Sequence, residues 1–110
     1  MYYDDEDFLP ETIPSAEERV ELGAIRLDHI HPDWYREIEF RFFSIADCQR
    51  CILGQIGGYN RWLTTLGNDV EEYPEKYGFE LYYKVNEDER RGEEIVDLES
   101  AWKDAIQKRK

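Results

Sequence analysis

Hydrophobic residues recur at helical spacing in three stretches of the chain. The first stretch follows Ser15, which forms an S-x-x-E capping box with Glu18 and therefore predicts a helix start. The apolar stripe of this helix consists of Ala16, Val20, Ala24 and Leu27. Because Pro32 disfavours helical backbone at the residue before it, we expect the helix to end between His29 and His31.

The stretch 48–67, CQRCILGQIGGYNRWLTTLG, is the longest run without acidic residues, and we expect it to form the buried centre. Ser44 or Asp47 is suited to cap a helix at its start. Gly57 and Gly58 predict a break in that helix, since a glycine costs about 1 kcal/mol in a helix interior. A second short helix then ends before Gly67. The apolar faces of the two helices consist of Cys48, Ile52, Ile56, Tyr59, Trp62, Leu63 and Leu66.

Two segments alternate between apolar and polar residues, which is the period of a half-buried β-strand. In residues 38–42, the apolar positions are Ile38, Phe40 and Phe42. In residues 79–85, they are Phe79, Leu81, Tyr83 and Val85. We expect the two segments to pair as a short antiparallel sheet, and helices must cover this sheet because two strands alone are marginal.

The third helical stretch is predicted from about Asp97 to Arg109. Its stripe consists of Ile95, Leu98, Trp102, Ala105 and Ile106. Residues 68–78 and 86–94 are charged, and we expect them to be connecting loops. Together these elements predict an α+β fold that is mainly helical, with three to four helices packed on a short two-stranded antiparallel sheet.

At 110 residues, the chain has the size of one domain. Hydrophobic residues make up 41% of it, which is too many for a disordered chain although 36% of the residues are charged. Residues 1–14 differ from the rest because they carry five acidic residues and two prolines. We therefore expect an acidic, flexible arm at 1–14 and a single globular domain at 15–110.

The net charge is −12, from 26 acidic against 14 basic residues. This charge disfavours direct binding to nucleic acid, whose phosphates attract lysine and arginine. It favours either simple solubility or a basic partner protein. An ordered array of carboxylates can also mimic the charge spacing of a nucleic-acid backbone. The candidate interaction surface consists of Asp4, Asp5, Glu6, Asp7, Glu17, Glu18, Glu21, Glu71, Glu72 and Glu75.

The chain has no apolar run of about 18 residues, so we expect no contact with a membrane. Its N-terminus is acidic where a signal peptide is basic. We therefore expect the protein to stay in the cytoplasm, where cysteines remain reduced.

Cys48 and Cys51 are spaced as C-x-x-C, and with His29 and His31 they make a full set of tetrahedral zinc ligands. The order of the four residues is unlike that of a common zinc finger. A histidine at a helix end more often bonds the last-turn carbonyls than performs chemistry. Free thiols without a cofactor are therefore the leading interpretation, and zinc is the alternative.

Aromatic residues suggest a second kind of site. Trp34, Tyr59, Trp62 and Trp102, with Arg61 nearby, could form a pocket for a nucleotide-like ligand. A phosphorylated ligand needs positive groups, and only Arg50 and Arg61 lie in the central stretch. The sequence contains no visible pair of nucleophile and base, so we expect no enzymatic activity.

Several short motifs resemble one group of proteins. They are C-I-L-G-Q-I-x-G at 51–58, Leu66-Gly67, Gly78-Phe79 and A-W-x-x-x-I at 101–106. This pattern, which covers about Val20 to Arg109, resembles small uncharacterised proteins encoded by phages of actinobacteria. The group has no assigned activity. The resemblance implies a phage accessory protein that acts in the cytoplasm of a bacterial host.

These observations lead to one functional hypothesis and two alternatives. The leading hypothesis is an interaction protein whose acidic surface binds and inhibits a basic host or phage protein. Phage accessory proteins are small, and binding needs only about 800 Å² of surface per partner. The alternatives are a small-molecule binder with the aromatic pocket and a small domain stabilised by zinc.

Overall fold

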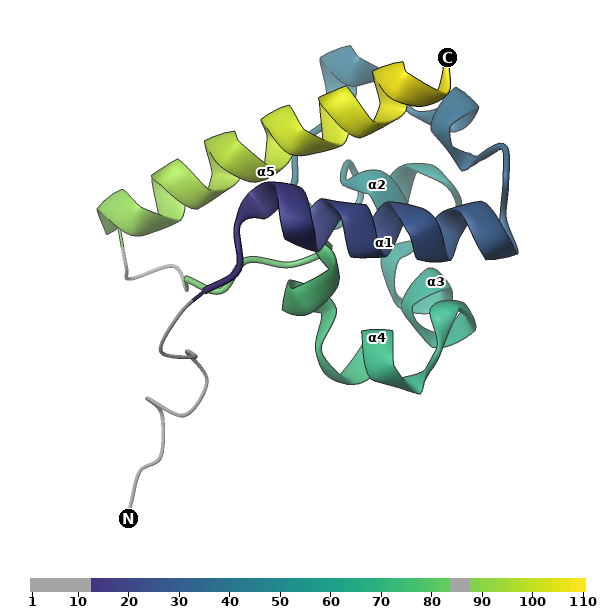
Figure 1. Ribbon diagram of the computed structural model, residues 1–110, viewed down its shortest axis with the longest axis horizontal. Helices are drawn as coiled ribbons and strands as arrows, with labels where there is room; N and C mark the ends of the chain where they lie inside the picture. The colour runs from purple at the N-terminus through teal and green to yellow at the C-terminus, as the bar shows by residue number, and fades with distance from the viewer. Residues whose placement is uncertain (1–12, 84–87) are drawn as a thin grey trace.

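The structure, a computed structural model, describes residues 13–83 and 88–110. Its α-helices are α1 (Ala16–Ile30), α2 (Ile52–Gln55), α3 (Tyr59–Leu66), α4 (Asn68–Glu72) and α5 (Asp88–Arg109). Three 3₁₀ turns complete it: η2 (Trp34–Glu37), η3 (Phe40–Phe42) and η4 (Pro74–Tyr77). Helix α1 crosses the middle of the molecule, with α5 on one side and α3 and α4 on the other (Figure 1).

The start and end of α1 are those predicted from the sequence. The Ser15 hydroxyl accepts a hydrogen bond from the backbone N–H of Glu18, and the Glu18 carboxylate accepts one from the N–H of Ser15, both at 3.1 Å. Val20, Ala24 and Leu27 are buried, as the helical spacing predicted. The helix ends at Ile30, and the backbone of His31, the residue before Pro32, has left the helical region with φ −145° and ψ 75°.

The central stretch forms part of the core, as predicted, but Cys48, which the spacing placed on its apolar face, is exposed because it lies in the turns before α2. Its buried residues are Cys51, Ile52, Leu53, Ile56, Leu63 and Leu66. Gly57 and Gly58 separate α2 from α3 with φ angles of 144° and 134°, which residues with a side chain rarely adopt. The predicted caps Ser44 and Asp47 were wrong, because residues 44–50 form turns and the thiol of Cys51 caps α2 instead.

The predicted two-stranded sheet was also wrong. Residues 13–83 and 88–110 contain no β-strand. Within 38–42, the backbone turns at η3, where the N–H of Phe43 donates to the carbonyl of Phe40. The turn places Phe43 in the core and leaves Phe42 with 53% of its surface exposed, whereas the alternation predicted Phe42 inside.

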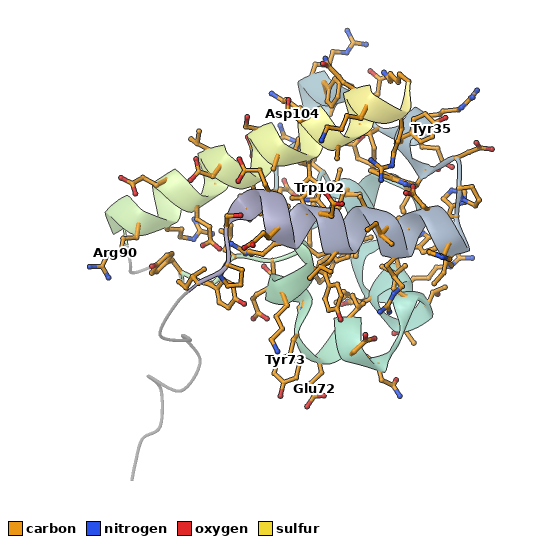
Figure 2. The ribbon with its side chains drawn as sticks, in the orientation of Figure 1. Tyr35, Glu72, Tyr73, Arg90, Trp102 and Asp104 are labelled. Atoms are coloured by element: carbon orange, nitrogen blue, oxygen red, sulfur yellow. The ribbon has the colours of Figure 1, made fainter. Side chains whose placement is uncertain are left out.

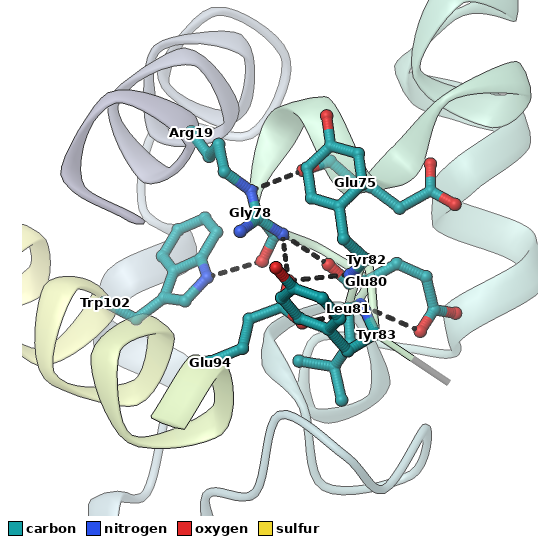
Figure 3. A network of polar contacts seen from close by, with 9 residues as sticks. All are labelled: Arg19, Glu75, Gly78, Glu80, Leu81, Tyr82, Tyr83, Glu94 and Trp102. Atoms are coloured by element: carbon teal, nitrogen blue, oxygen red, sulfur yellow. Dashed lines mark hydrogen bonds and ion pairs between the residues drawn. The ribbon is translucent and has the colours of Figure 1, made fainter. Parts of the chain in front are cut away.

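The second predicted strand, 79–85, is an irregular, bent segment as far as Tyr83, and residues 84 and 85 lie outside the described part. Its backbone groups form hydrogen bonds with side chains and not with a neighbouring strand (Figure 3). The N–H groups of Tyr82 and Tyr83 donate to the two carboxylate oxygens of Glu94, at 2.7 and 3.0 Å. Trp102 Nε1 donates to the carbonyl of Gly78 at 2.8 Å.

Arg19 completes this network from α1. Its Nη2 lies 2.9 Å from Glu94 Oε2, and the side chains of both residues are almost entirely buried. Arg19 also donates to the carbonyls of Glu75 and Glu80, at 2.8 and 2.9 Å. Its guanidinium lies 4.5 Å from the centre of the Tyr82 ring. The buried pair therefore connects α1, the segment 78–83 and α5.

The other ends of α1 and α5 are joined by a second ion pair. Arg109 Nη2 lies 2.7 Å from Asp28 Oδ2, and Trp34 Nε1 donates to Asp28 Oδ1 at 3.0 Å. The Arg109 guanidinium holds the pKa of Asp28 below its ordinary value. Since the two ion pairs join start to start and end to end, α1 and α5 run in the same direction.

Two predicted loops contain helices. Residues 68–78 form α4 and η4, and α5 begins at Asp88 rather than near Asp97. The sequence predicted a loop for the first turns of α5 because this stretch is charged and contains few apolar residues. Among residues 90–94 the buried side chain is that of Glu94, whose partner Arg19 lies on another helix.

We predict that Arg19→Met and Glu94→Gln each lower the free energy of unfolding by about 3–5 kcal/mol, since each leaves a buried charge unpaired. The double variant should lose less free energy of unfolding than the sum of the losses in the two single variants. Urea denaturation measures both effects. Arg61→Met is the matched control, because Arg61 is exposed. An Arg19→Met variant as stable as the control would contradict a structural role for the pair.

Substituting alanine for two glycines in helix interiors should change the free energy of unfolding in opposite directions. A Cβ at Gly92 meets nothing within 4 Å, so Gly92→Ala should raise the free energy of unfolding by about 0.5–1 kcal/mol. A Cβ at Gly23 collides with the carbonyl of Tyr77, so Gly23→Ala should lower it. Denaturation midpoints of the two variants test this packing of α1 on η4, and equal shifts would contradict it.

Candidate interaction surface

The first half of α1 presents carboxylates to solvent. Glu17 and Glu21 are exposed and lie one helical turn apart, so they form a short acidic ridge on the helix surface. A depression lies on each side of the ridge. We call these depressions the interhelical groove and the outer hollow.

The interhelical groove lies between α1 and α5 and has a volume of about 240 Å³. Small apolar residues form its floor, because Val20 and Ala24 of α1 face Ala101 and Ala105 of α5. Charged side chains line the rest of the groove. These residues are Glu17, Glu21, Asp104, Lys108 and Arg109.

The outer hollow lies on the solvent side of α1. It is lined by Pro14, Leu22 and the side chains of Glu17, Glu18 and Glu21. Leu22 is 50% exposed, and Ile25, three residues further along the same face, is 42% exposed. An aliphatic surface beside carboxylates suits a lysine or arginine, whose stem is apolar and whose end is charged.

Among the described residues, no ion pair within 4 Å engages the carboxylates of this surface. None of the ion pairs among residues 13–83 and 88–110 involves Glu17, Glu18, Glu21 or Asp104. Glu18 is occupied by the capping box, whereas Glu17 and Glu21 repel one another at i,i+4 spacing. This repulsion is small, and it is offset because Glu17 lies in the first turn of α1, near the positive end of the helix dipole.

The other predicted acidic residues lie elsewhere. Glu71 and Glu72 are exposed on α4, and Figure 2 shows Glu72 and Asp104 on opposite sides of α1. Glu75 is half-buried in η4, where its carbonyl accepts from Arg19. Asp4, Asp5, Glu6 and Asp7 lie outside the described residues. The predicted acids of α1 are therefore joined by Asp104 of α5, and those of α4 form a separate region.

Three residues of this surface were absent from the sequence-based set. Leu22 and Ile25 fall off the buried stripe of α1, and helical periodicity alone identifies them as exposed apolar residues. Asp104 is different, because its place beside Glu17 and Glu21 depends on how α5 packs on α1. No local pattern contains that information.

The predicted aromatic pocket residues fall into two groups. Trp34 and Trp102 are completely buried and pack edge to face at 5.6 Å, so they fill the core. Tyr59 is half-buried and donates to Glu80 Oε2 at 2.6 Å. Trp62 is half-buried and stacks on His31 at 5.2 Å, while Arg61 is exposed. A ligand pocket remains a prediction, and it would have to form around Tyr59, Arg61 and Trp62.

The predicted zinc ligands have other contacts. His29 Nδ1 lies 2.9 Å from the carbonyl of Ile25, and His31 Nε2 lies 2.6 Å from Glu37 Oε2. Cys48 is exposed, whereas Cys51 is buried and accepts from the N–H of Gly54 at 3.4 Å. Within the part of the chain that the structure describes, no three acidic, histidine or cysteine side chains are arranged to hold a metal ion.

Comparisons with protein-family models, with curated proteins and with solved structures find no significant match.

None of the helices in residues 13–83 and 88–110 has the length and apolar character that crossing a bilayer requires.

Burial raises the pKa of the Cys51 thiol to about 11, so the reactive thiolate is scarce near neutral pH. We predict that iodoacetamide at pH 8 alkylates exposed Cys48 and modifies Cys51 about a hundredfold more slowly. Mass spectrometry of the modified peptides measures both rates. Unfolding in guanidinium should make the rates similar. Equal rates in the folded protein would show that Cys51 is accessible.

Proposed function

We propose that this protein is a non-enzymatic interaction protein that binds a basic partner protein through the acidic surface of α1. In line with the resemblance of its motifs, we propose a phage accessory protein that inhibits a host or phage target in the bacterial cytoplasm. A target that itself binds nucleic acid would present the basic surface that such a protein needs. This function requires no catalytic group and no cofactor.

One observation carries the proposal. The acidic ridge of Glu17 and Glu21 stands beside exposed Leu22 and Ile25, and no ion pair among the described residues neutralises it. Exposed apolar area supplies affinity when a partner covers it. Unpaired carboxylates select a basic partner and accelerate its association.

The test is affinity capture from the lysate of an actinobacterial host, at low and at high salt. A partner that binds through charge should be basic and should be released as salt screens the carboxylates. Reversing the ridge with Glu17→Lys and Glu21→Lys should weaken binding of the captured protein at least about tenfold, measured by titration with the purified partner.

Glu71→Lys with Glu72→Lys is the matched control, because it makes the same change in net charge on exposed residues of α4. The control should retain most of the affinity. Equal losses in the two double variants would mean that only net charge matters. A partner insensitive to ridge reversal and to salt would overturn the proposed function.

A further inference from the structure

We infer that Cys48 and Cys51 form a reversible thiol–disulfide site, a modification site that goes beyond the proposed function. Its oxidant is a low-molecular-weight disulfide, of which oxidised glutathione is an example. The exposed thiol of Cys48 reacts first, and the buried thiol of Cys51 then displaces the adduct and closes an intramolecular disulfide.

The backbone holds the two cysteines close together directly before α2. The N–H groups of Arg50 and Cys51 both donate to the carbonyl of Asp47 at 2.9 Å, so residues 47–51 form a single turn. Residues three apart in such a turn have Cα atoms within about 7 Å of one another, and a disulfide spans about 4.4–6.8 Å between Cα atoms. The sulfur of Cys51 already lies against residue 48, because its Sγ is 3.6 Å from the carbonyl oxygen of Cys48.

Packing on α2 keeps this turn in one conformation. The N–H of Gln49 donates to Asp47 Oδ1 at 2.9 Å. A Cβ at Gly54 would lie 2.2 Å from the carbonyl oxygen of Cys48, so the glycine allows the turn to lie directly on the helix. A turn fixed in this way has already lost the conformational freedom that two thiols must lose when they form a bond.

The difference in exposure gives the two thiols different roles. Cys48 is exposed to an oxidant in solution, whereas Cys51 is 2% exposed. Burial raises the pKa of Cys51 to about 11, so only about one thiol in a thousand is ionised at pH 8. An oriented intramolecular reaction reaches an effective concentration of about 10⁵–10⁸ M, which outweighs that loss. Cys51 is therefore slow with reagents in solution but able to attack a sulfur held beside it.

The reaction is two successive thiol–disulfide exchanges. The thiolate of Cys48 attacks one sulfur of oxidised glutathione, forms a mixed disulfide and releases one glutathione thiolate. Cys51 loses its proton and attacks the Cys48 sulfur, and the bond from Cys48 to the second glutathione breaks. The two released thiolates take up the protons that the two cysteines lost. Two protein thiols are thus oxidised while one glutathione disulfide is reduced to two thiols.

The product is a reversible modification and not a structural crosslink. The disulfide encloses only Gln49 and Arg50, and so short a loop constrains the unfolded chain little. Its Cys48 end lies at the surface, and exposed disulfides are the ones that thiols reduce readily. Reduced glutathione should therefore return the protein to the dithiol.

The experiment incubates the reduced protein with excess oxidised glutathione at pH 8 and follows the intact mass after acid quenching. The main product should be lighter than the reduced protein by two hydrogen atoms, as an intramolecular disulfide requires. Excess reduced glutathione should then restore the starting mass. A stable adduct with one glutathionyl group, a disulfide-linked dimer, a product that reduced glutathione leaves unchanged, or no reaction would each overturn the inference.

Two variants separate the roles of the cysteines. Cys51→Ser keeps an oxygen acceptor for the N–H of Gly54 and should accumulate the mixed disulfide on Cys48. Cys48→Ser is the matched control and should react at least about tenfold more slowly, since its remaining thiol is buried. Equal rates in the two variants would overturn the assignment. The mass of the wild-type product decides the main question even if a variant does not fold.

Unfolding separates the contribution of the turn from that of the C-x-x-C spacing alone. At a fixed ratio of reduced to oxidised glutathione, the folded protein should hold at least about tenfold more disulfide relative to dithiol than the same protein in concentrated urea. The physical reason is that the turn keeps the cysteines close only in the folded chain. Equal ratios of disulfide to dithiol in the two states would overturn the role of the turn.

Discussion

The buried ion pair between Arg19 and Glu94 determines how the helices of this protein fit together. Removing two charges from water costs several kcal/mol per ion, and the cost is offset only when every charged atom has good partners. Glu94 meets this requirement with Arg19 and two backbone N–H groups, and Arg19 with two further carbonyls. These bonds replace the strand partner that the segment 78–83 lacks. Together with Asp28 and Arg109 at the opposite ends, they fix the relative position of α1 and α5.

Local sequence rules predicted the helices whose signals are local. The capping box of Ser15, the glycines at 57 and 58 and the apolar stripe of α1 each involve neighbouring residues, and each was confirmed. The sheet was not predicted correctly because alternation reports only which residues are apolar. In residues 79–83, the carbonyl of Glu80 and the N–H groups of Tyr82 and Tyr83 bond side chains of α1 and α5, which lie outside the segment. A pattern within the segment cannot distinguish those partners from a second strand.

In the candidate interaction surface, too, some residues follow from the local sequence and others from tertiary packing. Glu17 and Glu21 were identified from charge alone, and Leu22 and Ile25 follow from the period of α1. Their assembly with Asp104 depends on the packing of two helices that are remote in the chain. The packing also explains why the acids of α4 belong to a different region from those of α1. Charge content therefore indicates the kind of partner, whereas tertiary structure decides which carboxylates act together.

The parallel contact between α1 and α5 has a consequence for the order in which the protein forms during synthesis. The two helices that share the ion pairs lie near opposite ends of the described sequence. While the ribosome is still translating residues 90–110, the apolar stripe of α1 can pack on η4 and α3 but lacks its largest contact, which is with α5. Loop-closure entropy makes such distant contacts slow to form, and uncovered apolar surface is prone to aggregate. The nascent chain therefore depends on completion of α5, and truncation within α5 leaves α1 without its main partner.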